Sequence, residues 1–256
     1  IREHAATTIT VDAGEGVDTL KVDDGTNVTA AKMVNFSNFE ILELTNNAGA
    51  TAIDLDGLSM FTTIVNSDDT GATSTINNAA ANTALSITVA GGNDENTTLS
   101  LKDDTATDSI NVTIGAATGT TAVSMGTLTL ANHETINIET VSGATNTIAA
   151  LTSADATLLN VTGEKNLTIT AFTSSSNLET IDASAMTGNF VMSAALVSTD
   201  ATTITTGSGD DTILAKAAAD TTIVSNDGDD QITGNSGDDT ITSGAGDDVI
   251  TSVEGD

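Results

Sequence analysis

The end of the chain repeats every nine residues. Four blocks keep the string G-D-D-x-I: TGSGDDTIL (206–214), SNDGDDQIT (225–233), GNSGDDTIT (234–242) and SGAGDDVIT (243–251). A further block, KAAADTTIV (216–224), keeps the strand but lacks the turn glycines; Ala215 is one extra residue before it, and a clipped SVEGD (252–256) follows the last full block. Such a period fixes the architecture, because each repeat stacks on its neighbours. The pattern G-G-x-G-x-D-x-U-x, with U a large apolar residue, predicts a parallel β-roll that binds Ca²⁺ in its turns.

The spacing gives each position of the repeat a physical role. The first six positions reverse the chain, with glycine where a side chain would strain the backbone, and the last three form a short strand. The sixth position holds an aspartate in four blocks: Asp211, Asp230, Asp239 and Asp248. The eighth position of the same blocks holds the inward apolar residue: Ile213, Ile232, Ile241 and Ile250. A disordered acidic tail is the alternative, but such a tail needs no isoleucine at every ninth residue.

Two nonapeptides make one coil, so each turn is expected to stack on the next turn but one. One edge of the roll then carries the turns at 206–211, 225–230 and 243–248, and sites are predicted between Asp211 and Asp230 and between Asp230 and Asp248. The other edge stacks the degenerate turn at 216–220, the turn at 234–239 and the clipped turn from residue 252. Asp239 there faces Asp220, which is shifted to position five, so weaker or irregular sites are predicted on that edge.

Charge restricts the partners of the chain. The net charge is −30, from 36 acidic and 6 basic residues, and residues 206–256 alone carry eleven Asp, one Glu and one Lys. Self-repulsion of this size opposes a compact state unless cations bind. It also argues against nucleic acid and against an anionic membrane as direct partners. No apolar stretch approaches the roughly 20 residues of a membrane-spanning helix, so membrane insertion is not expected.

The rest of the chain is predicted to be β-structure. Short runs alternate apolar residues with Thr or Ser: 8–11, 41–44, 62–65, 86–89, 98–101, 110–114, 127–130, 135–138, 158–161, 167–170, 190–193 and 202–205. Proline, which cannot donate to a strand ladder, is absent. We expect an all-β fold, an elongated parallel β-solenoid over residues 1–205 that ends in a calcium-binding β-roll over 206–256. A β-sandwich-like domain followed by the β-roll is the alternative.

A second repeat is the frame N-x-E before a strand, with glutamates Glu40, Glu134 and Glu179. It suggests a solenoid corner, in which Asn takes a left-handed turn and Glu accepts backbone amides. A ladder of metal or partner ligands is the other interpretation. An isolated nonapeptide, AGEGVDTLK (13–21), places Asp18 at the sixth position and makes it a candidate calcium ligand.

Little in the sequence points to catalysis. The chain has no Cys, no G-x-S-x-G and no H-E-x-x-H, and its histidines, His4 and His133, are expected to be structural or exposed. Adjacent aspartates such as Asp68 and Asp69 are interpreted as solvated turns or peripheral cation sites. We expect no enzyme activity.

The terminal blocks resemble the repeats-in-toxin (RTX) family, which is exported by type I secretion. The segments AGEGVDTLKV, NFSNFEILEL, NHETINIE, LLNVTGEKNLTIT and SNLETIDASAMTG make the rest of the chain similar to the C-terminal half of bacterial surface-layer proteins of the Caulobacter and Campylobacter type. The resemblance implies ligation of Ca²⁺ by the paired aspartates and by backbone oxygens near the turn glycines. The implied set comprises Asp210, Asp211, Asp229, Asp230, Asp238, Asp239, Asp247, Asp248, Gly207, Gly209, Gly228, Gly237 and Gly246.

The same resemblance implies a function. A secreted protein of the cell surface would self-assemble into a two-dimensional surface-layer (S-layer) lattice stabilised by Ca²⁺. Its partner would be further copies of itself, with cell-surface polysaccharide bound through regions outside this sequence. A stalk or binding segment of a secreted RTX adhesin and the β-roll tail of a secreted hydrolase are the alternatives.

Overall fold

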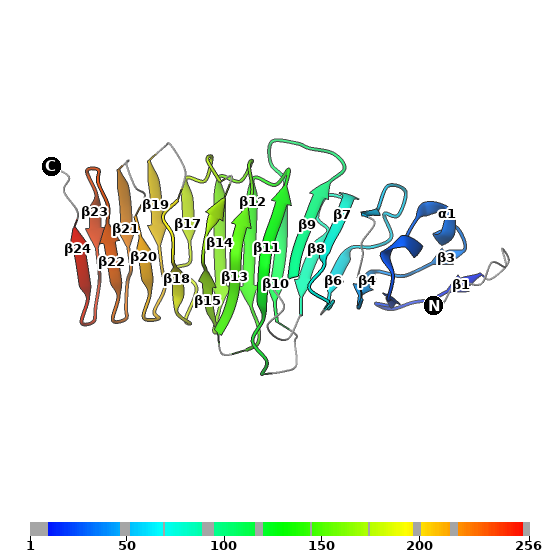
Figure 1. Cartoon of the computed structure of the whole chain (residues 1–256), viewed down its shortest axis with the longest axis horizontal. Helices are drawn as coiled ribbons and strands as arrows, with labels where there is room; N and C mark the ends of the chain where they lie inside the picture. Colours follow the sequence, from blue (N-terminus) through cyan, green and yellow to red (C-terminus); the bar gives the residue numbers. More distant parts are fainter. Residues whose placement is uncertain are drawn as a thin grey trace.

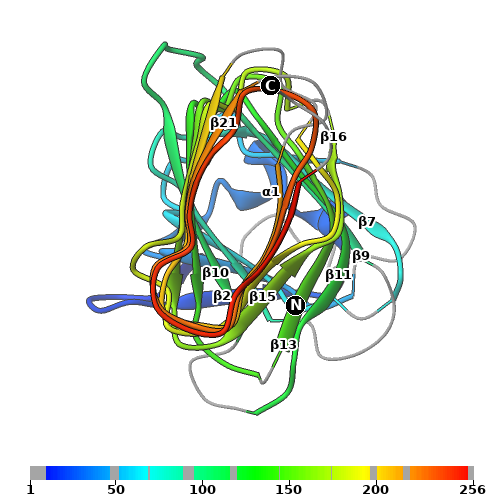
Figure 2. The same cartoon turned by 90° about the vertical axis from the view of Figure 1, so that its left-hand side faces the viewer.

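The chain forms one right-to-left stack of coils in Figure 1, a parallel β-solenoid drawn from the blue N-terminal end to the red C-terminal end. The structure is a computed structural model and describes residues 10–46, 52–68, 70–88, 95–115, 120–143, 145–173, 175–196, 201–215 and 220–252. Two long sheets face each other and enclose the core between them, as the end view in Figure 2 shows. The predicted all-β solenoid is therefore confirmed, and the sandwich alternative is wrong because every strand pair is parallel to its neighbour in the next coil.

The first sheet takes one strand from each successive coil. Its strands, in spatial order, are β2 (Thr19–Val22), β4 (Ile41–Leu44), β6 (Thr63–Asn66), β8 (Ala84–Ile87), β10 (Ser109–Ile114), β12 (Thr135–Thr140), β14 (Leu158–Gly163), β17 (Thr180–Asp182), β19 (Thr202–Thr205), β21 (Thr221–Val224) and β23 (Thr240–Thr242).

The second sheet takes the strands in between. They are β5 (Ile53–Asp54), β7 (Thr73–Ala79), β9 (Glu95–Leu101), β11 (Ser124–Ala131), β13 (Thr145–Thr152), β15 (Asn166–Ile169), β18 (Phe190–Met192), β20 (Thr212–Leu214), β22 (Gln231–Gly234) and β24 (Val249–Ser252), and β16 (Phe172–Thr173) also pairs with β13. Each strand of one sheet thus serves as the crossover between two parallel strands of the other.

The period-2 alternation of the sequence becomes columns of inward residues. In the first sheet, one buried column is formed in register by Ile110, Ile136, Leu159, Ile181, Ile204 and Ile223. Thr, Asn and Ser alternate with them and point outward, so one apolar residue every second position is enough to fill the interior. The nonapeptide isoleucines extend these columns: Ile213 pairs with Ile232 in the second sheet, and Ile223 pairs with Ile241 in the first.

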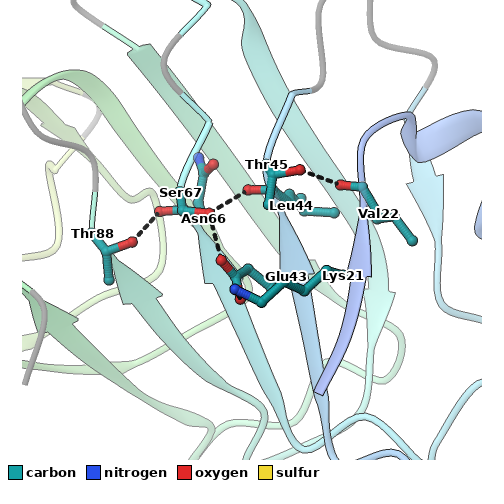
Figure 3. Close-up of polar contacts among 8 residues, drawn as sticks. All are labelled: Lys21, Val22, Glu43, Leu44, Thr45, Asn66, Ser67 and Thr88. Carbon is teal, nitrogen blue, oxygen red and sulfur yellow. Dashed lines mark hydrogen bonds and ion pairs between the residues drawn. The ribbon is translucent and has the colours of Figure 1, made fainter. Parts of the chain in front are cut away.

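Hydroxyl side chains join neighbouring coils where strands of the first sheet end. The Oγ1 of Thr45, the Oγ of Ser67 and the Oγ1 of Thr88 each donate to a carbonyl oxygen of the preceding coil, as Figure 3 shows. Ser67 also donates to Glu43, whose carboxylate forms a 2.7 Å ion pair with Lys21. Each of these carbonyls also accepts the backbone amide of the same Thr or Ser, so the hydroxyl adds a second hydrogen bond between the coils.

The N-terminal end is closed by a small irregular segment. It contains β1 (Val11–Asp12) paired with β3 (Phe36–Ser37), the 3₁₀ turn η1 (Gly25–Asn27) and the one-turn helix α1 (Ala30–Met33). Asp24 caps η1 and Thr29 caps α1, and Val28, Met33 and Phe39 are buried against the first coils. The opposite end has no such cover among the described residues, and Ile250 is 49% exposed there.

Most predicted strands appear at or within two residues of their places, and several strands were not predicted. β7 and β13, whose Asn and Ala residues weaken the alternation, are the longest of the missed ones. Part of the predicted strands at 8–11 and 86–89 lies outside the described residues.

The interpretation of Asp68 as a solvated turn residue is wrong: Asp68 is fully buried, and its Oδ1 accepts the amide of Thr70 inside a corner. Asp69 lies outside the described residues.

Candidate functional site

The turns of the nonapeptide segment stack in the predicted order. β20 pairs with β22 and β22 with β24, with Thr212 opposite Gln231 and Gln231 opposite Val249. The first offset is one residue longer than the second because Ala215 is inserted between the blocks. The turns at 206–211, 225–230 and 243–248 therefore lie above one another at one edge of the solenoid. We call these three turns the main edge.

The aspartates at position six of the main edge form an inner ladder. The backbone amide of Asp211 donates to Oδ1 of Asp230 (2.8 Å), and the amide of Asp230 donates to Oδ1 of Asp248 (3.1 Å). The amide of Phe190, in the preceding coil, donates in the same way to Oδ1 of Asp211 (2.7 Å). One oxygen of each carboxylate thus fixes the coil before it. The second oxygens of Asp211 and Asp230 are buried and have no hydrogen-bond partner.

The aspartates at position five form an outer ladder that runs in the opposite direction. The amide of Asp229 donates to Oδ1 of Asp210 (3.0 Å), and the amide of Asp247 donates to Oδ1 of Asp229 (2.8 Å). These side chains are exposed. The two ladders together clamp each turn to the coil before it and to the coil after it.

The outer ladder begins before the nonapeptides. The amide of Asp210 donates to Oδ1 of Asn189 (3.1 Å), and the amide of Asn189 donates to Oδ1 of Asn166 (3.0 Å). Sequence reasoning missed these two turns. The string TGNF at 187–190 could have indicated one of them. It corresponds to SGDD at 208–211 in the next coil, with Asn and Phe in place of the two aspartates.

Position six is a core position, and this makes its aspartates unusual. Leu167 and Phe190 occupy it in the two preceding coils and are fully buried. Asp211 and Asp230 continue the same column with exposures of 1% and 0%. Burial raises the pKa of Asp211 to about 6 and also raises the pKa of Asp230 above its ordinary value, because a charged carboxylate is poorly solvated inside the roll. Each carboxylate has one oxygen with a hydrogen bond, and a bound cation would offset the remaining cost of burying its charge at neutral pH.

The residues present fit calcium as the source of that charge. The ion pairs found in the described parts of the chain, Lys21 with Glu43 and Lys102 with Asp56, lie far from the roll. Two buried oxygens, on Asp211 and Asp230, are free to coordinate. Within the described ranges no three Asp, Glu, His or Cys side chains converge on one point, so backbone carbonyls would have to complete a shell. Hard oxygen donors of this mixed kind are the ligands that Ca²⁺ prefers.

Glycine is what allows the carbonyls of successive turns to come close. Gly228 and Gly246 have φ angles of +127° and +146°. A Cβ on Gly228 would lie 2.2 Å from the carbonyl oxygen of Gly209, and one on Gly246 would lie 1.9 Å from that of Gly228. Any other residue would push the stacked turns apart. The hydroxyls that replace glycine at position one are used differently: Thr206 and Ser225 donate to the carbonyls of Ser225 and Ser243.

The opposite edge of the roll has the same ladders with fewer carboxylates. The amide of Asp238 donates to Oδ1 of Asp220 (3.0 Å), which places Asp220 at position five, and the amide of Thr221 donates to Oδ1 of Asp239 (2.9 Å). Position six of the degenerate block is therefore threonine. Asp239 is half-buried, whereas Asp230 is fully buried. Residues 216–219 and 253–256 of this edge lie outside the described residues.

The isolated nonapeptide near the N-terminus forms a turn of the same shape. Gly14 and Gly16 have φ angles of +94° and +129°, and Oδ2 of Asp18 is buried without a hydrogen bond. The amide of Asp18 donates to Oε2 of Glu40 (2.9 Å), so a glutamate of the N-x-E frame takes the place of the next aspartate of the ladder. The isolated nonapeptide and the N-x-E frame are separate features of the sequence, and the fold brings them into contact.

The other corner residues have structural partners. Oε2 of Glu134 accepts the amide of Asp108 (2.6 Å), and Asn38 and Asn132 have left-handed φ angles of 58° and 65°. Asn177 does not adopt this conformation, because its side chain instead donates to the carbonyl of Ala154 (2.7 Å).

The structure describes one of the two histidines. His133 occupies the inward position of the corner, is fully buried and has its pKa lowered by burial. His4 lies outside the described residues. In the part of the chain that the structure describes, no helix is long and apolar enough to cross a membrane.

Comparison with known proteins identifies the turns. Residues 198–223 and 224–256 match the family model of the RTX calcium-binding nonapeptide repeat (4 copies). No curated protein matches the chain. RTX repeats are calcium-binding motifs of proteins that are typically secreted. The C-terminal part of this chain is thus an RTX β-roll, and its metal is calcium.

Proposed function

We propose that this chain is part of a secreted structural protein of the cell surface, which self-assembles into a calcium-stabilised S-layer lattice. The observation that carries the proposal is the column of buried carboxylates at Asp211 and Asp230, which continues an apolar core and forms no ion pair among the described residues. A protein with this column would fold completely only where calcium is plentiful. The space outside the cell, where RTX repeats bind calcium, meets this condition.

The proposed ligands follow from the ladders. The free oxygens of Asp211 and Asp230 would each hold an ion between their own turn and a neighbouring turn. Asp248 and Asp239 would contribute in the same position, with carbonyls near the turn glycines. The exposed residues Asp210, Asp229, Asp238 and Asp247 would keep the turns in place through their amide bonds and add negative charge around the ions. When bound, Ca²⁺ supplies the positive charge that lets these carboxylates stay ionised in the interior.

Calcium would then couple secretion to folding. Binding to the folded state alone adds its free energy to folding. Extracellular calcium modules have dissociation constants of about 10⁻⁴–10⁻³ M. The roll would remain unfolded where calcium is scarce and fold after export. Asp18, whose free oxygen lies beside Glu40, is proposed as a further ligand at the other end of the solenoid.

Assembly is the proposed role of the outer surface. The net charge of −30 gives neighbouring molecules faces that repel one another until a cation neutralises or bridges them. The two long parallel sheets, with one strand from each coil, offer repetitive surfaces for contact between copies. This role needs no catalytic group, and we propose that the chain has none.

Two other functions share the calcium roll. A stalk or binding segment of a secreted RTX adhesin would use the solenoid as a spacer, and a hydrolase would use the roll as its tail. Each predicts a chain that stays monomeric in calcium. Polysaccharide attachment through regions outside this sequence is compatible with the lattice and with the adhesin.

Light scattering during a calcium titration tests the proposal. The purified full-length protein should form large particles as Ca²⁺ rises through the millimolar range, and negative-stain electron microscopy should show ordered sheets. Mg²⁺ at the same concentration is the control for simple screening. A double variant, Asp211→Asn with Asp230→Asn, should need more calcium. A protein that stays monomeric at every calcium concentration would refute the lattice and leave the stalk.

A further inference from the structure

A polar groove crosses the outer face of the first sheet. Its volume is about 450 Å³, within the range of roughly 300–1,000 Å³ that is usual for ligand sites. The floor is formed by β10, β12, β14 and β17, which lie side by side in the middle of the stack in Figure 1. This groove is separate from the calcium turns, which begin after β19.

The groove exists because one strand is short. β12 and β14 each have six residues, whereas β17 has three and stops at Asp182. The chain then turns outward through Ser184 and Ala185, which form the wall of the groove. Asp182 fixes this turn, since its Oδ1 accepts both the amide (3.0 Å) and the hydroxyl (2.6 Å) of Ser184.

A column of side-chain amides runs along the floor, across the strands. Asn111, Asn137, Asn160 and Asp182 are in register in successive coils. The Nδ2 of Asn160 donates to Asn137 (2.7 Å), and the Nδ2 of Asn137 donates to Asn111 (3.0 Å). The ladder therefore ends with a donor group at Asn111 and an acceptor oxygen at Asn160, beside the carboxylate of Asp182.

Both kinds of hydrogen-bonding capacity stay open to a ligand. The groove contains the free Nδ2 of Asn111, the free Oδ1 of Asn160, the second oxygen of Asp182 and the carboxylate of Glu139, none of which makes a hydrogen bond within the described part of the chain. Glu139 and Asp182 belong to strands two apart and are offset by two residues along the strands, so their backbones are about 11–12 Å apart. They are too far apart to chelate one ion, so a ligand that uses both has to be extended.

The lining restricts the chemistry of that ligand. It contains no aromatic and no basic side chain, which excludes stacked bases and anions such as phosphates or uronates. A second copy of this chain, with six basic residues against 36 acidic ones, has little to offer two carboxylates. Ammonium and guanidinium groups only donate hydrogen bonds, so they cannot use the Nδ2 donor of Asn111. Hydroxyl groups donate and accept, so a chain of hydroxyls matches both ends of the amide ladder.

We propose that this groove binds a neutral glycan lying across β10, β12, β14 and β17. Its hydroxyls would donate to Glu139 and Asp182 and accept from Asn111, with the asparagine ladder as a flat floor. Hydrogen bonds to ionised carboxylates are the strong ones in such a site. Long-range attraction of cations is weakened by salt, since the screening length is about 8 Å at physiological ionic strength. Short-range hydrogen bonding therefore selects the ligand.

The test is a glycan array probed with the fluorescently labelled chain in millimolar Ca²⁺. The array carries neutral hexose and N-acetylhexosamine oligomers, hexuronate oligomers, and an oligolysine peptide. Binding is expected to a subset of the neutral oligomers and to neither the hexuronates nor oligolysine. Asn137→Thr, which breaks the ladder, and Asp182→Asn, which keeps the bond to Ser184 but removes the charge, should each weaken binding about tenfold.

Thr222→Val on β21 is the matched control, because Thr222 is exposed on the same sheet outside the groove. It should change affinity less than about twofold. Far-ultraviolet circular dichroism of each variant confirms that the fold is kept. If the chain binds oligolysine but none of the neutral oligomers, the groove is instead a site for a basic partner. Absence of binding to every neutral oligomer, or equal binding by all variants, would overturn it.

Discussion

The amide of Asp211 donates a 2.8 Å hydrogen bond to Oδ1 of Asp230, nineteen residues later, while Oδ2 of Asp230 is buried without a partner. The same carboxylate therefore has a structural oxygen and a free oxygen. The structural oxygen fixes the register of two coils, and the free oxygen is the one left for a metal. This division explains how the turns can be ordered by their own hydrogen bonds and still depend on calcium.

Loss of a calcium ligand should depend on the edge. Asp230→Asn keeps an oxygen for the amide of Asp211 but removes the charge, and it should lower calcium affinity by on the order of tenfold, because affinity follows the number of charged ligands. Asp239→Asn should lower it less, since Asp239 is only half-buried and faces a degenerate turn. Isothermal titration calorimetry of both variants measures the difference. Equal losses would contradict the assignment of the main edge.

Acid should stabilise the roll when calcium is absent. The folded-state pKa of Asp211 is raised to about 6, above its ordinary value of 3.8, so this carboxyl favours folding most when protonated. That stability is fully present below about pH 4 and is lost as the pH rises through 6. Thermal unfolding of the metal-free protein should therefore show a more stable roll at pH 5 than at pH 7.5, a difference of on the order of 1–3 kcal/mol in its free energy of unfolding.

The control for this pH dependence is the neighbouring Asp210, which is exposed. Asp211→Asn should flatten the profile, whereas Asp210→Asn removes the same charge and should leave it in place. Calcium should reverse the trend, because protons compete with the metal for the same oxygen. If both variants keep the profile of the native chain, general charge repulsion and not Asp211 is responsible.

Calcium should order the roll selectively. Hydrogen exchange with mass spectrometry should show protection of amides in 201–251 that appears with millimolar Ca²⁺ and disappears with chelator. The strands β10 to β14, which have an apolar core and no buried acidic column, should be protected in both states. Uniform protection with and without calcium would show that the roll folds on its own.

Glycine at the stacked turns should be irreplaceable. Gly228→Ala places a Cβ 2.2 Å from the carbonyl oxygen of Gly209 and strains a residue at φ +127°. The expected loss of stability is about 2–4 kcal/mol, measured by thermal unfolding in calcium. Gly14→Ala is the control: its φ is +94° but nothing lies within 4 Å of the new Cβ, so the loss should be smaller, about 1 kcal/mol.

The corner glutamates should differ in importance. Glu134→Ala leaves the amide of Asp108 without its 2.6 Å acceptor and should cost about 1–3 kcal/mol. Glu179→Ala should cost less than about 0.5 kcal/mol, because no side-chain hydrogen bond of Glu179 is found among the described residues. Urea unfolding in calcium compares the two. A similar cost at both positions would show that the N-x-E frame acts through something other than the amide bond.

The solenoid and its calcium-binding repeats could both be predicted from the sequence alone. The nine-residue period requires stacked turns, and an isoleucine at the eighth position of each repeat requires a thin core between two sheets. The missing prolines and the alternation of Thr with Val, Ile or Leu extended the same fold toward the N-terminus. These features are local and periodic, so they can be read without knowing which coils touch.

Only the tertiary structure decided which residues meet across coils. The partnership of Asp18 with Glu40 and the extension of the outer ladder to Asn189 and Asn166 join residues about 20 positions apart. The coil length varies from 18 residues in the roll to 31 between Thr97 and Leu128, so no fixed period predicts these pairs. Register across strands depends on how each coil fits its neighbours, and that fit also buried Asp68 and His133, which their sequence context placed in ordinary turns.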